Sequence, residues 1–101
     1  MYVSIRSYEV QEGCVAEFAR RVQRSFVPYL NTTPGFQAYY MVDSKEGRLT
    51  TISLFDTYEA ALASQARASE FVKANLAEFV SGTPSVATGE TVLCIHGPSN
   101  H

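Results

Sequence analysis

The sequence has no tryptophan, only two cysteines and two histidines, and no long uninterrupted apolar run. Cys14 and Cys94 match no metal-binding spacing. Eight basic residues against ten acidic ones give a net charge of −2 without a basic stripe, which argues against nucleic acid and anionic membranes as partners. The apolar residues are too interrupted for a helix that spans a membrane.

Common catalytic signatures are also missing. The sequence has no G-x-x-x-x-G-K phosphate loop. His96 follows the last apolar segment without an evident Ser or Asp partner, which argues against a hydrolase triad. His96 and His101 belong to no cluster of metal ligands. We therefore expect no metal site and no cofactor.

The composition is that of one folded domain. Hydrophobic residues make up 46% of the 101 residues. We expect residues 1–96 to form a single domain and residues 97–101 a polar, turn-rich tail. A chain of this size buries only about 65% of its unfolded surface, which favours support from a partner subunit. The first residues show no charged segment followed by an apolar one, as a secretory signal would, so we expect a cytoplasmic protein.

Hydrophobic periodicity divides the chain into six elements. The pattern predicts strands over residues 2–10, 36–43, 49–55 and 86–95, and helices over 13–30 and 56–80. Pro28 is expected to kink or end the first helix nearby. Gly47 is placed for a positive φ in a hairpin loop, and Gly89 for a bulge in the last strand.

The start and middle of the second helix carry further signals. Asp56 and Glu59 form a D-x-x-E pattern in which Asp56 caps the helix and Glu59 can reach back. A single helix from there to Val80 would span about 35 Å, which overhangs a small sheet. We therefore expect a bend or break near Ser69.

The order strand-helix-strand-strand-helix-strand predicts an α+β, ferredoxin-like βαββαβ fold. The first and third strands would be central in a four-stranded antiparallel sheet with both helices on one face. Side chains alternate between the two faces of a strand, and large apolar groups occur on both. Because two helices cover only one face, we expect a second copy to cover the other as a two-fold homodimer.

The topology also places the two cysteines. Cys94 would lie near the start of the first strand and Cys14 beyond its end, tens of ångströms away at about 3.3 Å per residue. A disulfide needs Cα atoms within about 7 Å. Both thiols are therefore expected to be free.

Three motifs together resemble a known family. A strand ends in Val-x-x-Gly at residues 10–13, Thr-Pro-Gly-Phe opens the second strand at residues 33–36, and Leu-Phe-Asp-Thr-Tyr-Glu-Ala leads from the third strand into a helix at residues 54–60. The chain resembles the antibiotic biosynthesis monooxygenase (ABM) superfamily of dimeric α/β barrels over nearly its whole length. The motifs are structural, so they predict the fold better than the activity.

The resemblance implies several activities. The family includes cofactor-free oxygenases that convert aromatic phenols or anthrones to quinones, haem-degrading enzymes, isomerases or lyases, and members without known activity. Haem degradation in the family uses an asparagine, a tryptophan and a histidine. Arg6 stands where the asparagine would be and Ser64 lies near the tryptophan position, and no histidine precedes His96. This argues against haem degradation. The quinone-forming branch matches only in its tyrosines and arginines.

In such a fold the ligand space lies between the sheet and its helices. Arg6, Tyr8 and Tyr40 are then the candidate catalytic residues. Arg6 would hold an anionic or phenolate oxygen and stabilise developing charge, but an ion pair with Glu90 or Glu9 is the competing and slightly favoured interpretation. Tyr8 and Tyr40 would hydrogen-bond a phenolic substrate or position oxygen, although amphipathic core residues are the commoner role for tyrosine.

Four further residues are candidates for substrate binding. Ser53 and Phe55 share one face of the third strand. Ser64 and Arg67, three apart on the second helix, could face the same cavity, although an exposed helix surface is the favoured interpretation for Arg67.

Three functions remain open at this point. The first is a cofactor-free oxygenase acting on a hydrophobic aromatic substrate, which would itself reduce oxygen. The second is a non-catalytic dimeric protein, small-molecule-binding or stress-related. The third and weakest is an isomerase or lyase that uses a tyrosine or an arginine for proton transfer.

Overall fold

A computed structural model describes residues 1–98. The elements follow one another in the predicted alternation of strands and helices. They are β1 (Tyr2–Val10), α1 (Val15–Ser25), α2 (Val27–Asn31), β2 (Phe36–Asp43), β3 (Arg48–Phe55), α3 (Tyr58–Asn75), the 3₁₀ turn η1 (Ala77–Phe79) and β4 (Val80–Glu90). Residues 99–101, which include His101 and the end of the predicted polar tail, lie outside the described residues.

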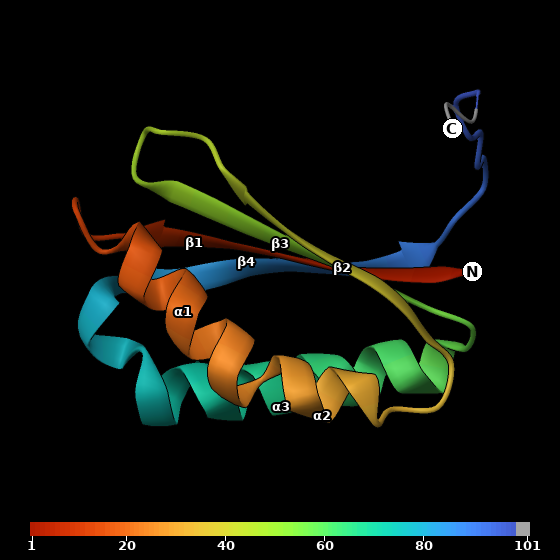
Figure 1. The fold of residues 1–101 in the computed structure, drawn as a ribbon, viewed down its shortest axis with the longest axis horizontal. Coiled ribbons are helices and arrows are strands. Elements are labelled where there is room, and N and C mark those ends of the chain that lie inside the picture. Colours follow the sequence, from red (N-terminus) through yellow and green to blue (C-terminus); the bar gives the residue numbers. More distant parts are fainter. Residues whose placement is uncertain (99–101) are drawn as a thin grey trace.

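The four strands form one antiparallel sheet in the order β2-β3-β1-β4. The helices all lie on one side of it, and the opposite side is uncovered in the single chain (Figure 1). This confirms the predicted α+β ferredoxin-like fold with central first and third strands.

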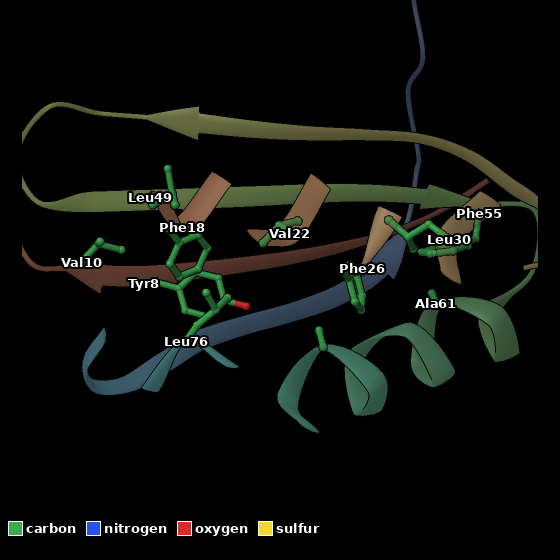
Figure 2. Packing of buried hydrophobic residues seen from close by; sticks show 11 residues of the cluster. Tyr8, Val10, Phe18, Val22, Phe26, Leu30, Leu49, Phe55, Ala61 and Leu76 are labelled. Carbon is green, nitrogen blue, oxygen red and sulfur yellow. The ribbon is translucent and has the colours of Figure 1, made fainter. Parts of the chain in front are cut away.

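Alternation along the two central strands separates a buried face from an outer face. In β1 the buried positions are Ser4, Arg6, Tyr8 and Val10, and in β3 they are Leu49, Thr51, Ser53 and Phe55. The apolar members of this set pack in one core with the apolar stripe of α1 and α2 (Figure 2). Figure 2 shows the Tyr8 ring beside the Phe18 ring, with centroids 5.4 Å apart. The core therefore lies between one sheet face and the helices.

The first predicted helix is divided in two at Phe26. This residue ends α1 and begins α2, and Pro28 follows in the first turn of α2. Because proline has no N–H to donate, it fits the first turn of a new helix better than the interior of a long one. The expected kink near Pro28 is confirmed, and it places Phe26 at the junction of the two helices.

The second predicted helix differs from expectation at three points. Helix α3 runs unbroken through Ser69, because no glycine or proline interrupts residues 58–75. It ends at Asn75 rather than near Val80 because residues 77–79 form a 3₁₀ turn into β4. Its N-cap is Thr57, whose hydroxyl accepts a hydrogen bond from the Ala60 N–H at 3.1 Å. Asp56 instead accepts one from Gln37 at 2.6 Å.

Strand β4 begins six residues earlier than predicted and ends five earlier. Val80 already pairs with Val10, and the irregularity in this ladder lies opposite β1 between Ser7 and Glu9 rather than at Gly89. Residues 82–84, which include Pro84, are therefore part of β4. Proline is tolerated there because β4 is an edge strand of the sheet. The strand ends at Glu90 because this residue pairs with Tyr2, where β1 begins.

The predictions for Gly47 and for the two cysteines are confirmed. Gly47 has a φ of +76° in the β2–β3 hairpin. Both cysteines are free thiols. No helix within residues 1–98 is long and apolar enough to cross a membrane. Over the same residues no group of three or more His, Cys, Asp or Glu is placed to hold a metal ion.

Candidate functional site

Arg6 projects from the middle of β1 toward the helices and is only 6% exposed. Its Nε donates a hydrogen bond to the Tyr8 hydroxyl at 2.6 Å. The pairing follows from strand geometry, because residues i and i+2 share one face. Its Nη1 donates to Oε1 of Gln65 on α3 at 2.9 Å. The guanidinium is thus held by two neutral side chains, one from the sheet and one from a helix.

The predicted ion pairs of Arg6 are absent. Among residues 1–98, no carboxylate lies within 4.0 Å of its guanidinium. Glu90 pairs instead with Tyr2, whose pKa it raises by a hydrogen bond, and Glu9 lies 4.0 Å from Arg48. The interpretation that Glu90 or Glu9 neutralises Arg6 is therefore wrong. A buried guanidinium normally has a compensating negative charge nearby. Arg6 is unusual because its hydrogen-bond partners among the described residues are neutral.

A small cavity lies beside Arg6, between the sheet and the helices. Its enclosed volume is about 20 Å³, enough for one water molecule. Its sheet wall is largely polar and is formed by Ser4, Arg6, Tyr8, Tyr39, Thr51 and Ser53. The helical wall is apolar apart from Ser64 and includes Phe18, Val22, Phe26, Ala68, Phe71, Val72 and Leu76. The polar wall can orient a polar group of a ligand, and the apolar wall can contact the ligand's apolar part.

The two tyrosines of the cavity are held in their protonated form. Burial raises the pKa of Tyr8 above its ordinary value of 10, although the hydrogen bond from Arg6 opposes the shift. Burial also raises the pKa of Tyr39, with a smaller contribution from nearby Tyr8, while Thr51 and Arg6 oppose it. Both hydroxyls therefore remain neutral at physiological pH and can donate hydrogen bonds.

Four of the seven predicted site residues line this cavity: Arg6, Tyr8, Ser53 and Ser64. The predicted position of Tyr40 is wrong, because Tyr40 lies on the outer sheet face and is 57% exposed. The cause is an irregularity between Phe36 and Ala38 in the ladder with β3. One extra residue reverses the faces of every following side chain, so Tyr39 points inward instead.

The other two predicted residues lie elsewhere. Phe55 is fully buried in the core, with its ring 5.9 Å from that of Phe36, and does not line the cavity. Arg67 is exposed on α3, and its guanidinium lies 5.0 Å from the Tyr29 ring centroid. The favoured interpretation of Arg67 as exposed helix surface is therefore confirmed.

Sequence reasoning missed Tyr39 and Gln65. The strand irregularity that turns Tyr39 inward has no clear sequence signal. Gln65 could have been found, because it follows Ala61 by four residues and lies beside Ser64 on the helical stripe that faces the sheet.

A second hollow lies outside the cavity, between α2 and α3. This outer groove has a volume of about 220 Å³ and is lined in part by Tyr29, Arg67 and Glu70. Phe26 and Phe71 line both the groove and the cavity, and their ring centroids are 5.5 Å apart. The two rings therefore stand between the groove and Arg6.

Comparison with known proteins supports the fold. The sequence profile of the family described as antibiotic biosynthesis monooxygenase matches residues 1–75. No curated protein sequence matches the chain. Among solved structures, the NE2512 protein of unknown function from Nitrosomonas europaea has a TM-score of 0.76 at 16% identity, covering 97% of this chain and 95% of that one.

Two other similar structures contain ligands. A monooxygenase from the gene ActVA-Orf6 of Streptomyces coelicolor, in complex with Nanaomycin D, has a TM-score of 0.76 at 14% identity, with 96% and 92% of the two chains covered. An MhuD variant with two manganese protoporphyrin IX molecules per active site has a TM-score of 0.73 at 21% identity, with 96% and 100% covered. At these identities the similarity establishes the fold alone.

Proposed function

The chain belongs to the antibiotic biosynthesis monooxygenase family, and from this premise we propose that it is a cofactor-free oxygenase acting on a phenolic aromatic small molecule. The observation that carries the proposal is Arg6, a buried cation without a carboxylate partner among the described residues, on the wall of a cavity. Its neighbours are neutral hydroxyls and aromatic rings, which suit a ligand with one oxygen on an apolar ring.

The proposed chemistry uses the substrate as the reductant. An anthrone loses a proton to water and becomes an electron-rich anion, which reacts with O₂ at the ring carbon to form a peroxide anion. The peroxide takes a proton back from water, and loss of water from the hydroperoxide leaves a ketone. The CH₂ group and O₂ thus become C=O and H₂O. Arg6 would bind the anionic oxygen and stabilise its charge. The protonated Tyr39 hydroxyl would donate a second hydrogen bond, and Tyr8 would hold Arg6 in place.

Entry of such a substrate requires the cavity to open. A space of about 20 Å³ cannot enclose a three-ring molecule, whereas ligand pockets usually measure about 300–1,000 Å³. Separation of Phe26 from Phe71 would join the cavity to the outer groove.

Oxygen consumption tests the function. With 1,8-dihydroxyanthrone and no added cofactor, the wild-type protein is expected to accelerate oxygen uptake above the uncatalysed rate. Arg6→Ala should abolish the acceleration because the binding group for the anion is gone. Arg24→Ala removes an exposed arginine of α1 and is the matched control. Full activity of the Arg6→Ala protein would refute the role of Arg6, and no acceleration by wild type would refute the function.

A second function is favoured by the cavity wall, which includes, among residues 1–98, no carboxylate or histidine that could take the substrate proton. A non-catalytic protein that holds a small molecule needs the same anion-binding wall but no route for oxygen. Tight binding of 1,8-dihydroxyanthrone without oxygen uptake would support this alternative.

We also propose a homodimer in the cytoplasm, formed through the outer sheet face. The apolar residues of this face are Val3, Ile5, Ala38, Tyr40, Val42, Ile52, Leu54 and Ala87. Beyond β4, Val92, Leu93 and Ile95 are 74–94% exposed. This segment leaves the sheet on the side opposite the helices (Figure 1). Apolar groups thus gather on one side of the molecule, where a second copy would bury them.

A further inference from the structure

Gln65 extends from the middle of α3 to two neighbouring strands. Its Oε1 accepts the hydrogen bond from Arg6 Nη1 at 2.9 Å. Its Nε2 donates to the Thr88 hydroxyl at 3.1 Å and lies 3.4 Å from the Ala87 carbonyl oxygen. Both ends of the amide are therefore used, and the contacts connect α3 with β1 and β4.

The chemistry of these partners fixes the orientation of the amide. A guanidinium only donates hydrogen bonds and a backbone carbonyl only accepts them. The amide oxygen of Gln65 must therefore face Arg6, and its NH₂ group must face Ala87. A glutamate at this position would have no proton for the Ala87 carbonyl. A neutral amide is thus the side chain of this length that satisfies both partners.

The amide holds Arg6 without neutralising it. Of the five guanidinium N–H bonds, two donate to Tyr8 and Gln65. The side chains of the cavity wall other than Arg6 carry hydroxyls or apolar groups, and none is a carboxylate. The positive charge therefore remains available to a ligand inside a poorly hydrated space, where a charge pair is stronger than in water.

We propose that Gln65 determines the charge of the ligand that this cavity accepts. By holding Arg6 in place while leaving its charge uncompensated, this positioning residue selects aromatic molecules with one anionic oxygen over neutral molecules of the same shape. The proposal rests on the proposed function only in using the same cavity, because it concerns ligand charge and not oxygen chemistry.

A pair of probes separates charge from shape. The two probes are 2-naphthoate, which is anionic at pH 7, and 2-naphthamide, which has nearly the same shape and is neutral. Binding to the full-length protein is measured by calorimetry or by quenching of the naphthalene fluorescence. Wild type is expected to prefer 2-naphthoate by about tenfold or more, because only this probe pairs with the guanidinium.

Three variants assign the preference to Gln65. Gln65→Glu places a carboxylate beside Arg6, so we expect affinity for 2-naphthoate to fall about 100-fold and that for 2-naphthamide to change less than about threefold. Gln65→Met removes the hydrogen bonds that hold Arg6 but adds no charge, so it should weaken 2-naphthoate binding more than 2-naphthamide binding and thereby reduce the preference. Gln23→Glu adds the same charge at an exposed site on α1 and should leave both affinities unchanged.

The remaining outcomes overturn the proposal. Equal wild-type affinities, binding of neither probe, or an unchanged preference in a folded Gln65→Glu protein would each show that Gln65 does not select for charge. If Gln65→Glu does not fold, an unchanged preference in a folded Gln65→Met protein would do the same. A wild-type preference that Gln65→Glu removes, without oxygen uptake on 1,8-dihydroxyanthrone, would refute the oxygenase function and leave this inference standing.

Discussion

Ile52 lies near the middle of the outer sheet face, where it pairs with Ile5 on β1 and Tyr40 on β2. The helices do not cover this face (Figure 1). In the proposed homodimer, Ile52 of each copy would be buried against its partner. Replacing it with aspartate introduces a carboxylate into the interface at two symmetric places, because a two-fold interface uses the same surface of both copies.

The outer sheet face is large enough to bury Ile52 of both copies. Four strands about 4.8 Å apart, with eight residues at about 3.3 Å in β3, give a face of roughly 500 Å² per copy. Each Ile52→Asp substitution would lose about 2 kcal/mol of apolar burial and cost several kcal/mol to desolvate the carboxylate. Over both copies the loss is about 10 kcal/mol, or roughly a 10⁷-fold weaker association.

Sedimentation equilibrium at about 10 µM protein measures the outcome. Wild type is expected at twice the chain mass of 11.1 kDa and Ile52→Asp at the mass of one chain. Circular dichroism checks that the variant is folded. Leu62→Asp makes a comparable change on the exposed side of α3 and should stay dimeric. A folded Ile52→Asp dimer, or a monomeric wild type, would refute the assignment of this face as the interface.

Two further predictions concern the cavity. Phe71→Ala removes one of the two rings between the cavity and the outer groove, so it should speed the binding of 2-naphthoate. Because Phe71 is only partly buried, the stability cost should be about 2 kcal/mol, less than the 3–5 kcal/mol of a fully buried phenylalanine. Leu62→Ala is the control, and stopped-flow rates that are equal in wild type and Phe71→Ala would contradict the role of the rings. The second prediction is alkaline destabilisation, because the pKa of Tyr39 is raised in the folded protein above its ordinary value of 10. The unfolded chain then releases this proton first, so the stabilisation is complete below pH 10 and is lost as pH rises toward the folded pKa, by up to about 1.4 kcal/mol per pH unit. Urea unfolding at pH 9, 10 and 11 should show a smaller decline for Tyr39→Phe than for wild type, and identical declines would argue against a shifted Tyr39.

The site could be predicted only in part from the sequence. Strict alternation along β1 was enough to place Arg6 and Tyr8 on the same buried face. Ser64 was placed by the family resemblance and by its spacing from Arg67, and only Ser64 of this pair is buried. Tyr40 was misplaced because one irregularity near Gln37 reverses the faces of the residues that follow. The neutral partners of Arg6 could not be predicted, because they depend on which side chain of α3 lies above β1.

The sequence by itself determined the order of the elements, the fold class and the two-sided apolar pattern of the sheet, because these depend on local periodicity and on glycine and proline positions. The tertiary structure decided where elements end and which side chains meet. Helix α3 caps on Thr57 rather than Asp56, and β4 stops at Glu90 because β1 provides no further partner. The tertiary structure also places the Arg6 guanidinium in contact with Gln65 instead of Glu90. Such contacts arise from the packing of segments distant in sequence, which no local pattern encodes.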